Sequence, residues 1–354
     1  MSPLLRLGAA AAVALSIVAG QQRTRQVLAA PGTDSPQAPS RLSETGLYLP
    51  GQPGQIDPRN RAFSPQYPLW SDGAHKSRWV FLPDGAVIDA RSSDWDMPVG
   101  TRFWKEFRFA DRKVETRMLW KAGVANWVVA SYVWNTDQAD AVLAPADGVP
   151  NVLEIAQGRA HSIPSRADCL ACHGAKRTTA LGFNALQLST DRDPLALHGE
   201  PLEAGMLTLE TLVREDRLSP PDRTLVIRPP RIATGDPQTR ALLGYFAANC
   251  GACHNSSGEI AVHGPSLKFS DLLADGDAVA AELVGHRTAW QVPGVADEQS
   301  VLIDPRTPDR SAMLVRMRSR RPSSQMPPLG TVLRDEDAVA ALQQWIAARP
   351  VRSH

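Results

Sequence analysis

The stretch TRFWKEFRF, Thr101–Phe109, decides the fold of the first part of the chain. Successive side chains of an extended chain point to opposite faces. Aromatic and charged residues alternate accordingly, with Phe103, Phe107 and Phe109 against Arg102, Glu106 and Arg108. The runs RWVFL (78–82), VETRMLW (114–120) and NWVVASYVWN (126–135) flank it, separated by short polar turns. This pattern predicts an antiparallel meander of strands.

Tryptophan is concentrated in the same region. Seven of the nine Trp residues fall between Trp70 and Trp134. We interpret them as core residues and cross-strand pairs, because large aromatic rings stabilise a half-buried sheet. The alternative is an aromatic surface that binds a ligand.

The N-terminus has the pattern of an export signal. Arg6 precedes an apolar or small-residue run, Leu7–Ala19, and Gly20 completes a small-residue cleavage site. The run is shorter than the ~20 residues that a membrane-spanning helix needs, although an uncleaved anchor is the alternative. We expect a signal peptide over residues 1–20, a flexible lead-in over 21–46, a periplasmic or secreted protein, and no stable membrane span after cleavage.

Two matching motifs hold all four cysteines of the chain: RADCLACHGA (166–175) and AANCGACHNS (247–256). Zinc ligation, dithiol exchange and haem c attachment can each use two thiols at this spacing. Zinc and dithiol sites do not call for a histidine directly after the second cysteine, whereas haem c does. We therefore predict two haem c groups, each with its iron. The covalent attachment residues are Cys169, Cys172, Cys250 and Cys253, and the proximal iron ligands are His173 and His254.

Each iron has a sixth position. For the second haem, SQMPPLGT (324–331) places Met326 in a proline-flanked loop, and a thioether is a suitable soft ligand. For the first haem we favour Met206, with His198 and His161 as alternatives. An iron without a sixth protein ligand is the remaining possibility.

These motifs lead to a family resemblance. GYFAANCGACHN, GPSL, QMPPLG and AVAALQQWIAA, within about residues 239–350, resemble a class I cytochrome c domain. The resemblance implies that the helix before the cysteines crosses the closing helix, with Phe246 and Trp345 at the crossing. The whole chain resembles a family of secreted bacterial dihaem proteins of unsettled function, through YPLWSDGAHKSRWVFLPDG, VVASYVWNTDQ and the two haem motifs. Pro164 departs from the class I pattern, because it excludes a long helix before Cys169.

The expected fold class is α+β and multidomain, with an N-terminal antiparallel β domain followed by mostly helical, cytochrome c-type haem regions. After the lead-in, the expected domains are a Trp-rich β domain (47–150), a first haem region (151–218), a proline-rich linker (219–238) and a class I-like domain (239–350).

The expected function is one-electron transfer by a periplasmic dihaem cytochrome c that is not an enzyme. Two alternatives stand beside it: a dihaem peroxidase or oxidase with an open first haem, and an electron-accepting module of a periplasmic dehydrogenase. A net charge of +1 gives no reason to expect nucleic acid as a partner. The basic run Arg310–Arg321 predicts docking to an acidic redox protein, unless it is only the solvated face of a helix.

Overall fold

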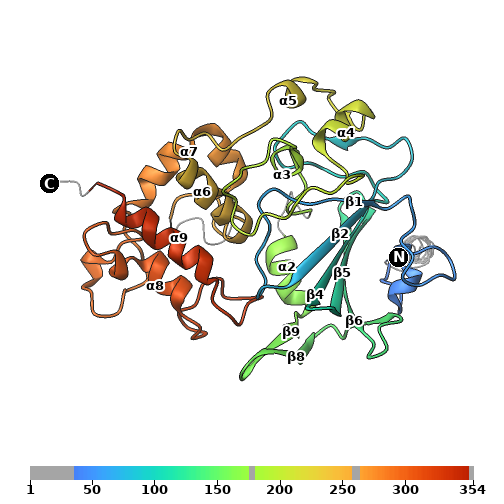
Figure 1. Ribbon diagram of the computed structural model, residues 1–354, viewed down its shortest axis with the longest axis horizontal. Coiled ribbons are helices and arrows are strands. Elements are labelled where there is room, and N and C mark those ends of the chain that lie inside the picture. Colours follow the sequence, from blue (N-terminus) through green and yellow to red (C-terminus); the bar gives the residue numbers. More distant parts are fainter. Residues whose placement is uncertain (1–35, 175–179, 257–263, 351–354) are drawn as a thin grey trace, which may run out of the picture. The chain divides into compact units, whose positions relative to one another are not determined.

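An antiparallel sheet of six strands dominates the computed structural model, which describes residues 36–174, 180–256 and 264–350. The strands follow the order β1-β2-β4-β5-β6-β7 (Figure 1). Their bounds are β1 Arg61–Ala62, β2 His75–Phe81, β4 Arg102–Phe109, β5 Arg112–Gly123, β6 Asn126–Trp134 and β7 Ala141–Leu143. Strands β2, β4, β5 and β6 form the meander that the alternating sequence predicts, so that prediction is confirmed.

Two smaller pairs of strands accompany the sheet. β8 (Val149–Ala156) and β9 (Arg159–Ile163) form an antiparallel hairpin. β3 (Ile88–Asp89) pairs in parallel with β10 (Leu218–Ser219).

The two faces of the sheet have separate hydrophobic cores. On one face, Trp104, Met118 and Tyr132 pack with the segment that begins at Leu42. Trp79 lies directly opposite Trp104 on the neighbouring strand, so the predicted cross-strand pairing of tryptophans is confirmed. On the other face, Phe103 packs with Phe183 and the residues around it. The side chains of the meander therefore alternate between the two faces of the sheet as predicted, but other parts of the chain cover both faces.

The prediction of mostly helical haem regions is wrong. The structure is mostly β, and the helices of its described residues are short. Their bounds are α2 Arg166–His173, α3 Ala185–Leu188, α4 Leu209–Arg214, α5 Thr224–Ile227, α6 Pro237–Asn249, α7 Phe269–Leu283, α8 Ala312–Arg318 and α9 Glu336–Ala347. The expected first haem region consists of a hairpin, short helices and loops. A CxxCH motif requires only one turn of suitable backbone, so it carries no information about the helix content around it.

Helices α6, α7, α8 and α9 share one hydrophobic core. α6 contacts α9, where the Trp345 indole nitrogen donates to the Thr239 hydroxyl at 2.9 Å. Phe246 is fully buried in the same core. The closing helix forms as its sequence predicts, with Asp335 as N-cap and an acidic first turn.

Residues from Ala38 onward belong to one compact unit. The expected domain boundaries stay predictions. The expected signal peptide and most of the lead-in lie outside the described residues. No helix in the described part of the chain is long and apolar enough to cross a membrane.

Candidate functional site

The first motif lies on the short helix α2. Ser165 caps the helix, accepting a hydrogen bond from the backbone N–H of Asp168, whose carboxylate accepts from the Ser165 N–H in return. The helix begins two residues after Pro164, so the prediction that no long helix precedes Cys169 is confirmed. Cys169 and Cys172 stand one helical turn apart and therefore share a face. Both thiols are half-buried, and His173 ends the helix.

The thiols of α2 lie beside the central strands of the sheet. Helix α2 packs against β6, and the Cys169 thiol lies beside Ser131 on that strand. Burial raises the pKa of Cys169, although the positive charge of nearby Arg117 acts in the opposite direction. The first motif is thus held over a sheet face that carries charge.

A buried ionic network forms this part of the sheet face. Glu115 is fully buried and accepts hydrogen bonds from Arg117 at 2.6 Å and from His161 at 3.1 Å. Burial raises the pKa of Glu115, but the Arg117 charge and the hydrogen bonds of both partners outweigh it and lower the pKa to about 2. The alternating sequence places Glu115 and Arg117 on a polar face, yet α2 and the hairpin β8–β9 cover that face.

The second motif begins where α6 ends. The backbone N–H of Cys250 still bonds to the Phe246 carbonyl at 2.7 Å, and the N–H of His254 bonds to the Cys250 carbonyl at 2.8 Å. The N–H of Leu267 bonds to the His254 carbonyl at 2.9 Å. A Cβ atom at Gly251 would lie 2.5 Å from the Leu267 carbonyl oxygen, so only glycine fits this turn.

The segment that links β1 to β2 packs against α6, the helix that leads into the second motif. The Tyr67 ring lies so close to α6 that a Cβ at Gly244 would come within 2.2 Å of it. The Trp70 N–H donates to the side chain of Asn249, the last residue of α6, at 2.8 Å. Residues 67–76 belong to the stretch that carries the family resemblance, and this packing gives that stretch a structural role that its sequence alone did not indicate.

The same segment also fixes the loop that follows Met326. The carboxylate of Asp72 accepts from the backbone N–H groups of Val332 and Leu333, at 2.9 and 2.8 Å. The Met326 carbonyl accepts from Arg320 at 3.2 Å, and its N–H donates to the Arg316 carbonyl at 3.0 Å. Met326 is therefore held by backbone contacts on both sides, with its side chain half-buried.

The two motifs meet through one cysteine of each. The Cys172 and Cys253 thiols lie close enough to alter each other's ionisation, and none of the four cysteines forms a disulfide. Their interaction raises the pKa of Cys172 and lowers that of Cys253. Sequence spacing alone gives no indication of this contact.

The alternatives for the sixth ligand of the first haem lie in different places. His161 is bound in the network with Glu115. His198 contacts both carboxylate oxygens of Asp335 at 2.9 Å, next to α9. Met206 is half-buried, and its N–H bonds to the Glu203 carbonyl. Both histidines thus have partners that a ligand role would have to displace.

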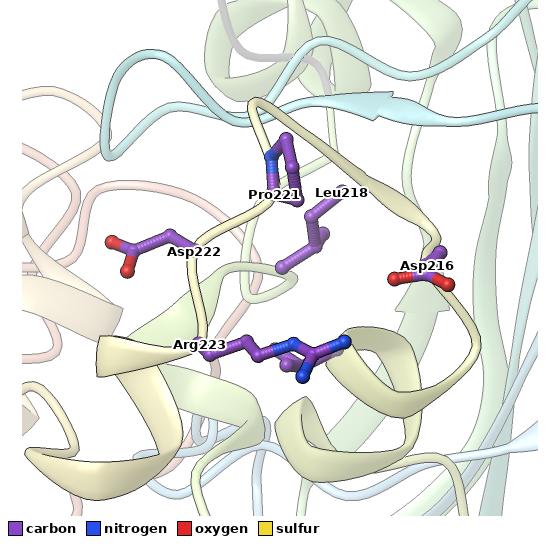
Figure 2. A pocket seen from close by; sticks show the side chains of 6 residues that line it. Asp216, Leu218, Pro221, Asp222 and Arg223 are labelled. Atoms are coloured by element: carbon purple, nitrogen blue, oxygen red, sulfur yellow. The ribbon is translucent and has the colours of Figure 1, made fainter.

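Two other features do not belong to these motifs. His198, Asp335 and Asp337 place potential metal-ligand atoms within 4.8 Å of one another, but Asp335 already serves as the N-cap of α9. The cavity in Figure 2 has about 10 Å³ of free volume, room for roughly one water. Its lining contains no side chain of a haem-ligating type: Val213, Asp216, Leu218, Pro221, Asp222 and Arg223.

The donor groups present fit haem c. Each motif offers two thiols for thioether bonds and an adjacent imidazole for iron, and Met326 offers a thioether on a fixed loop. The thiols are half-buried rather than sealed in the core. Attachment of haem would convert both Cys172 and Cys253 to thioethers, which have no S–H.

Comparisons with protein-family models, with curated proteins and with solved structures found no match to this chain. The resemblance to secreted dihaem proteins and to class I cytochromes c therefore stays a prediction from sequence motifs.

Proposed function

We propose that this chain is a periplasmic dihaem c-type protein that transfers single electrons. One observation carries the proposal: two complete CxxCH motifs, distant in the chain, lie together at Cys172 and Cys253. Two redox groups attached at adjacent residues would be close enough to exchange electrons. A pair of unrelated zinc or dithiol sites would have no need of this contact.

Haem c, when bound, supplies an iron that alternates between the ferric and ferrous states. Cys169 and Cys172 would anchor one haem, and Cys250 and Cys253 the other. His173 and His254 would provide the proximal imidazoles. The Met326 thioether would occupy the sixth position of the second haem and favour its reduced state.

The packing around the second motif suits an electron carrier. Tyr67, Asn249 and Asp72 connect α6 and the Met326 segment to the rest of the unit through close contacts and hydrogen bonds. Rigid support keeps the axial ligands in place when the charge of the iron changes. Small rearrangement favours fast electron transfer.

An acidic redox protein is the proposed partner. An open pocket of about 480 Å³ is rich in arginine. Its lining residues are Arg159, Arg318, Arg320, Val332, Leu333, Arg334 and Glu336. Arg320 in that lining also holds the Met326 carbonyl, so the basic surface adjoins the proposed iron ligand. Complementary charge would speed association with an acidic donor or acceptor.

The buried network beside the first motif favours a second candidate, a dihaem peroxidase. An open iron needs an acid or base close by to handle protons of a bound oxygen species. His161 and Glu115 form such a hydrogen-bonded pair, and Arg117 lies near both thiols of α2. Carbon monoxide binding to the reduced protein, and peroxide turnover lost in Cys169→Ala/Cys172→Ala, would favour this candidate over a pure carrier.

Haem staining of denatured protein tests the main proposal. The protein is produced in the periplasm of a host with a haem c maturation system. Cys169→Ala/Cys172→Ala and Cys250→Ala/Cys253→Ala should each retain about half of the wild-type stain, because thioether bonds survive denaturation. Full stain in either double variant would refute attachment at that motif.

A further inference from the structure

A row of basic residues crosses the sheet face beside the first motif. Arg78 on β2 lies directly opposite Lys105 on β4, and Lys105 lies opposite Arg117 on β5. Lys76, two residues before Arg78, points to the same face. Like charges directly opposite one another destabilise a sheet. Negative charge close to these basic residues is therefore needed to offset their mutual repulsion.

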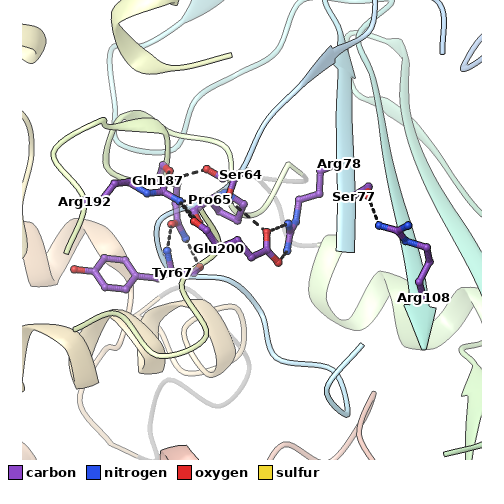
Figure 3. A network of polar contacts seen from close by, with 9 residues as sticks. All are labelled: Ser64, Pro65, Tyr67, Ser77, Arg78, Arg108, Gln187, Arg192 and Glu200. Carbon is purple, nitrogen blue, oxygen red and sulfur yellow. Dashed lines mark hydrogen bonds and ion pairs between the residues drawn. The ribbon is translucent and has the colours of Figure 1, made fainter. Parts of the chain in front are cut away.

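Two members of the row have that compensation within the protein. Arg78 makes two hydrogen bonds to the Glu200 carboxylate, at 2.5 and 3.2 Å (Figure 3). Arg117 is bound to Glu115. These ion pairs compensate the charges of Arg78 and Arg117 but not those of the two lysines in the row.

Lys76 and Lys105 have no such partner. In the part of the chain that the structure describes, neither ammonium group lies within 4.0 Å of a carboxylate oxygen. Both side chains are half-buried. Burial, together with the charges of neighbouring cations such as Arg78, lowers the pKa of Lys76 to about 8 and that of Lys105 well below its ordinary value. An anion that binds here would favour the charged form of both lysines.

The row ends at the first attachment cysteine. Ser131 on β6 is the next residue in register after Arg117, and it lies beside Cys169. Neighbouring strands lie roughly 5 Å apart, so Lys105 stands about 10 Å across the sheet from Ser131. A haem carries its two propionates on the edge of the macrocycle opposite to the vinyl groups that join the cysteines.

We propose that Lys76 and Lys105 bind the two propionates of the haem attached at Cys169 and Cys172. This inference rests on the proposed function. Two unpaired ammonium groups match two carboxylates in charge. Charge-assisted hydrogen bonds of this kind are strong when partly buried. The sheet would thereby set the orientation of the first haem and raise its reduction potential, because nearby positive charge favours the ferrous state.

Potentiometric titration of the haem-loaded protein tests the inference. Lys76→Met and Lys105→Met are compared with Lys113→Met, which also removes one charge but whose ammonium lies 3.7 Å from the Trp134 ring. Trp134 belongs to the core on the opposite face. Cys250→Ala/Cys253→Ala, which should keep only the first haem, assigns the two redox waves.

Each lysine variant should lower the potential of the first haem by about 59 mV, a tenfold change in its one-electron equilibrium constant. The second haem and the Lys113 variant should titrate as the wild type does. Unchanged first-haem potentials in both lysine variants would overturn the inference while the haem stain still supported the proposed function. Thermal stabilisation of the loaded wild type by inorganic phosphate, lost in Lys105→Met, would also overturn it, since a free anion would then occupy the row.

Discussion

The Cys172 thiol lies against the Cys253 thiol, and this contact joins two motifs that belong to different parts of the fold. Cys172 lies on helix α2, which packs against the sheet. Cys253 lies just past α6, which packs against α7 and α9. The proposed redox centre is therefore assembled by tertiary structure and depends on the correct packing of both regions.

The contact predicts a disulfide in protein made without haem. Mild oxidation by oxidised glutathione should join Cys172 to Cys253, because thiols in contact exchange most readily. Peptide mapping under non-reducing conditions should recover a peptide that links the two motifs. Cys172→Ser should abolish it, whereas Cys169→Ser should not. Bonds formed only within each motif would contradict the contact.

Much of the sheet could be predicted from sequence. Alternation in Thr101–Phe109 and in the adjoining runs is a local signal, and it identified the meander and the faces of its aromatic residues. The acidic first turn of α9, which Asp335 caps, is a local signal of the same kind. Both depend on residues close together in the chain, which is where sequence periodicity carries information.

Arg320 is predicted to position the proposed Met326 ligand. Its guanidinium donates to the carbonyls of Met317 and Met326, at 2.7 and 3.2 Å. Arg320→Met should weaken the near-infrared sulfur-to-iron band of the oxidised protein. Loss of these hydrogen bonds should reduce the free energy that holds the Met326 loop in place by roughly 1–3 kcal/mol.

Arg318→Met is the matched control for Arg320. Arg318 donates to the Asp309 carboxylate and to the Gln343 side chain, both at 2.7 Å, rather than to the Met326 carbonyl. A band of equal strength in both variants would show that the loop does not need Arg320. Survival of the band in Met326→His would show that another residue is the ligand.

The arginine-lined pocket is predicted to attract anionic reductants. Arg159→Gln and Arg334→Gln in the pocket lining, combined with Arg321→Gln in the neighbouring basic run, should slow reduction by ascorbate at low ionic strength, roughly tenfold, because these side chains are exposed at the surface. Stopped-flow spectroscopy at low salt and at 1 M salt, where the Debye length is about 3 Å, measures the effect.

Reduction by the cation hexaammineruthenium(II) is the control for charge. It should become faster in the triple variant, since repulsion is removed. The same change in rate with both reductants would mean that the substitutions alter the haem rather than the electrostatic potential of the protein surface.

The ionised carboxylate of Glu115 is predicted to stabilise the folded protein at neutral pH. Its pKa lies near 2 in the folded protein, below the ordinary value of 4.5, so its contribution is complete above pH 4.5 and disappears as the pH falls toward 2. Glu115→Gln should lower the free energy of unfolding by roughly 3 kcal/mol at pH 7, because it leaves Arg117 without its partner. Denaturant unfolding at pH 7 and pH 3 measures this loss, which should shrink at pH 3.

Glu106→Gln is the control for Glu115. Burial raises the pKa of Glu106, so ionisation of this carboxyl costs stability at neutral pH. The variant should be as stable as the wild type at pH 7, or more stable. Equal losses in the two variants would contradict the assigned roles.

The candidate site could be predicted only in part. CxxCH is a contiguous pattern, so its cysteines and histidines are visible in the sequence. The burial of Glu115 and Arg117 depends on α2 and the β8–β9 hairpin, and the row from Arg78 to Arg117 depends on strand register. These are long-range features that no local pattern encodes. The expectation of helical haem regions failed for the same reason, because a CxxCH motif does not determine the fold around it.

The mass of the intact, denatured protein is the most direct test of two covalent haems. The protein, produced with haem c maturation and freed of non-covalent ligands by acid and organic solvent, is weighed by electrospray mass spectrometry. We predict the mass of the polypeptide plus two haems, falling by one haem in each double-cysteine variant. The mass of the bare polypeptide, from a host that matures a control cytochrome c normally, would contradict the account.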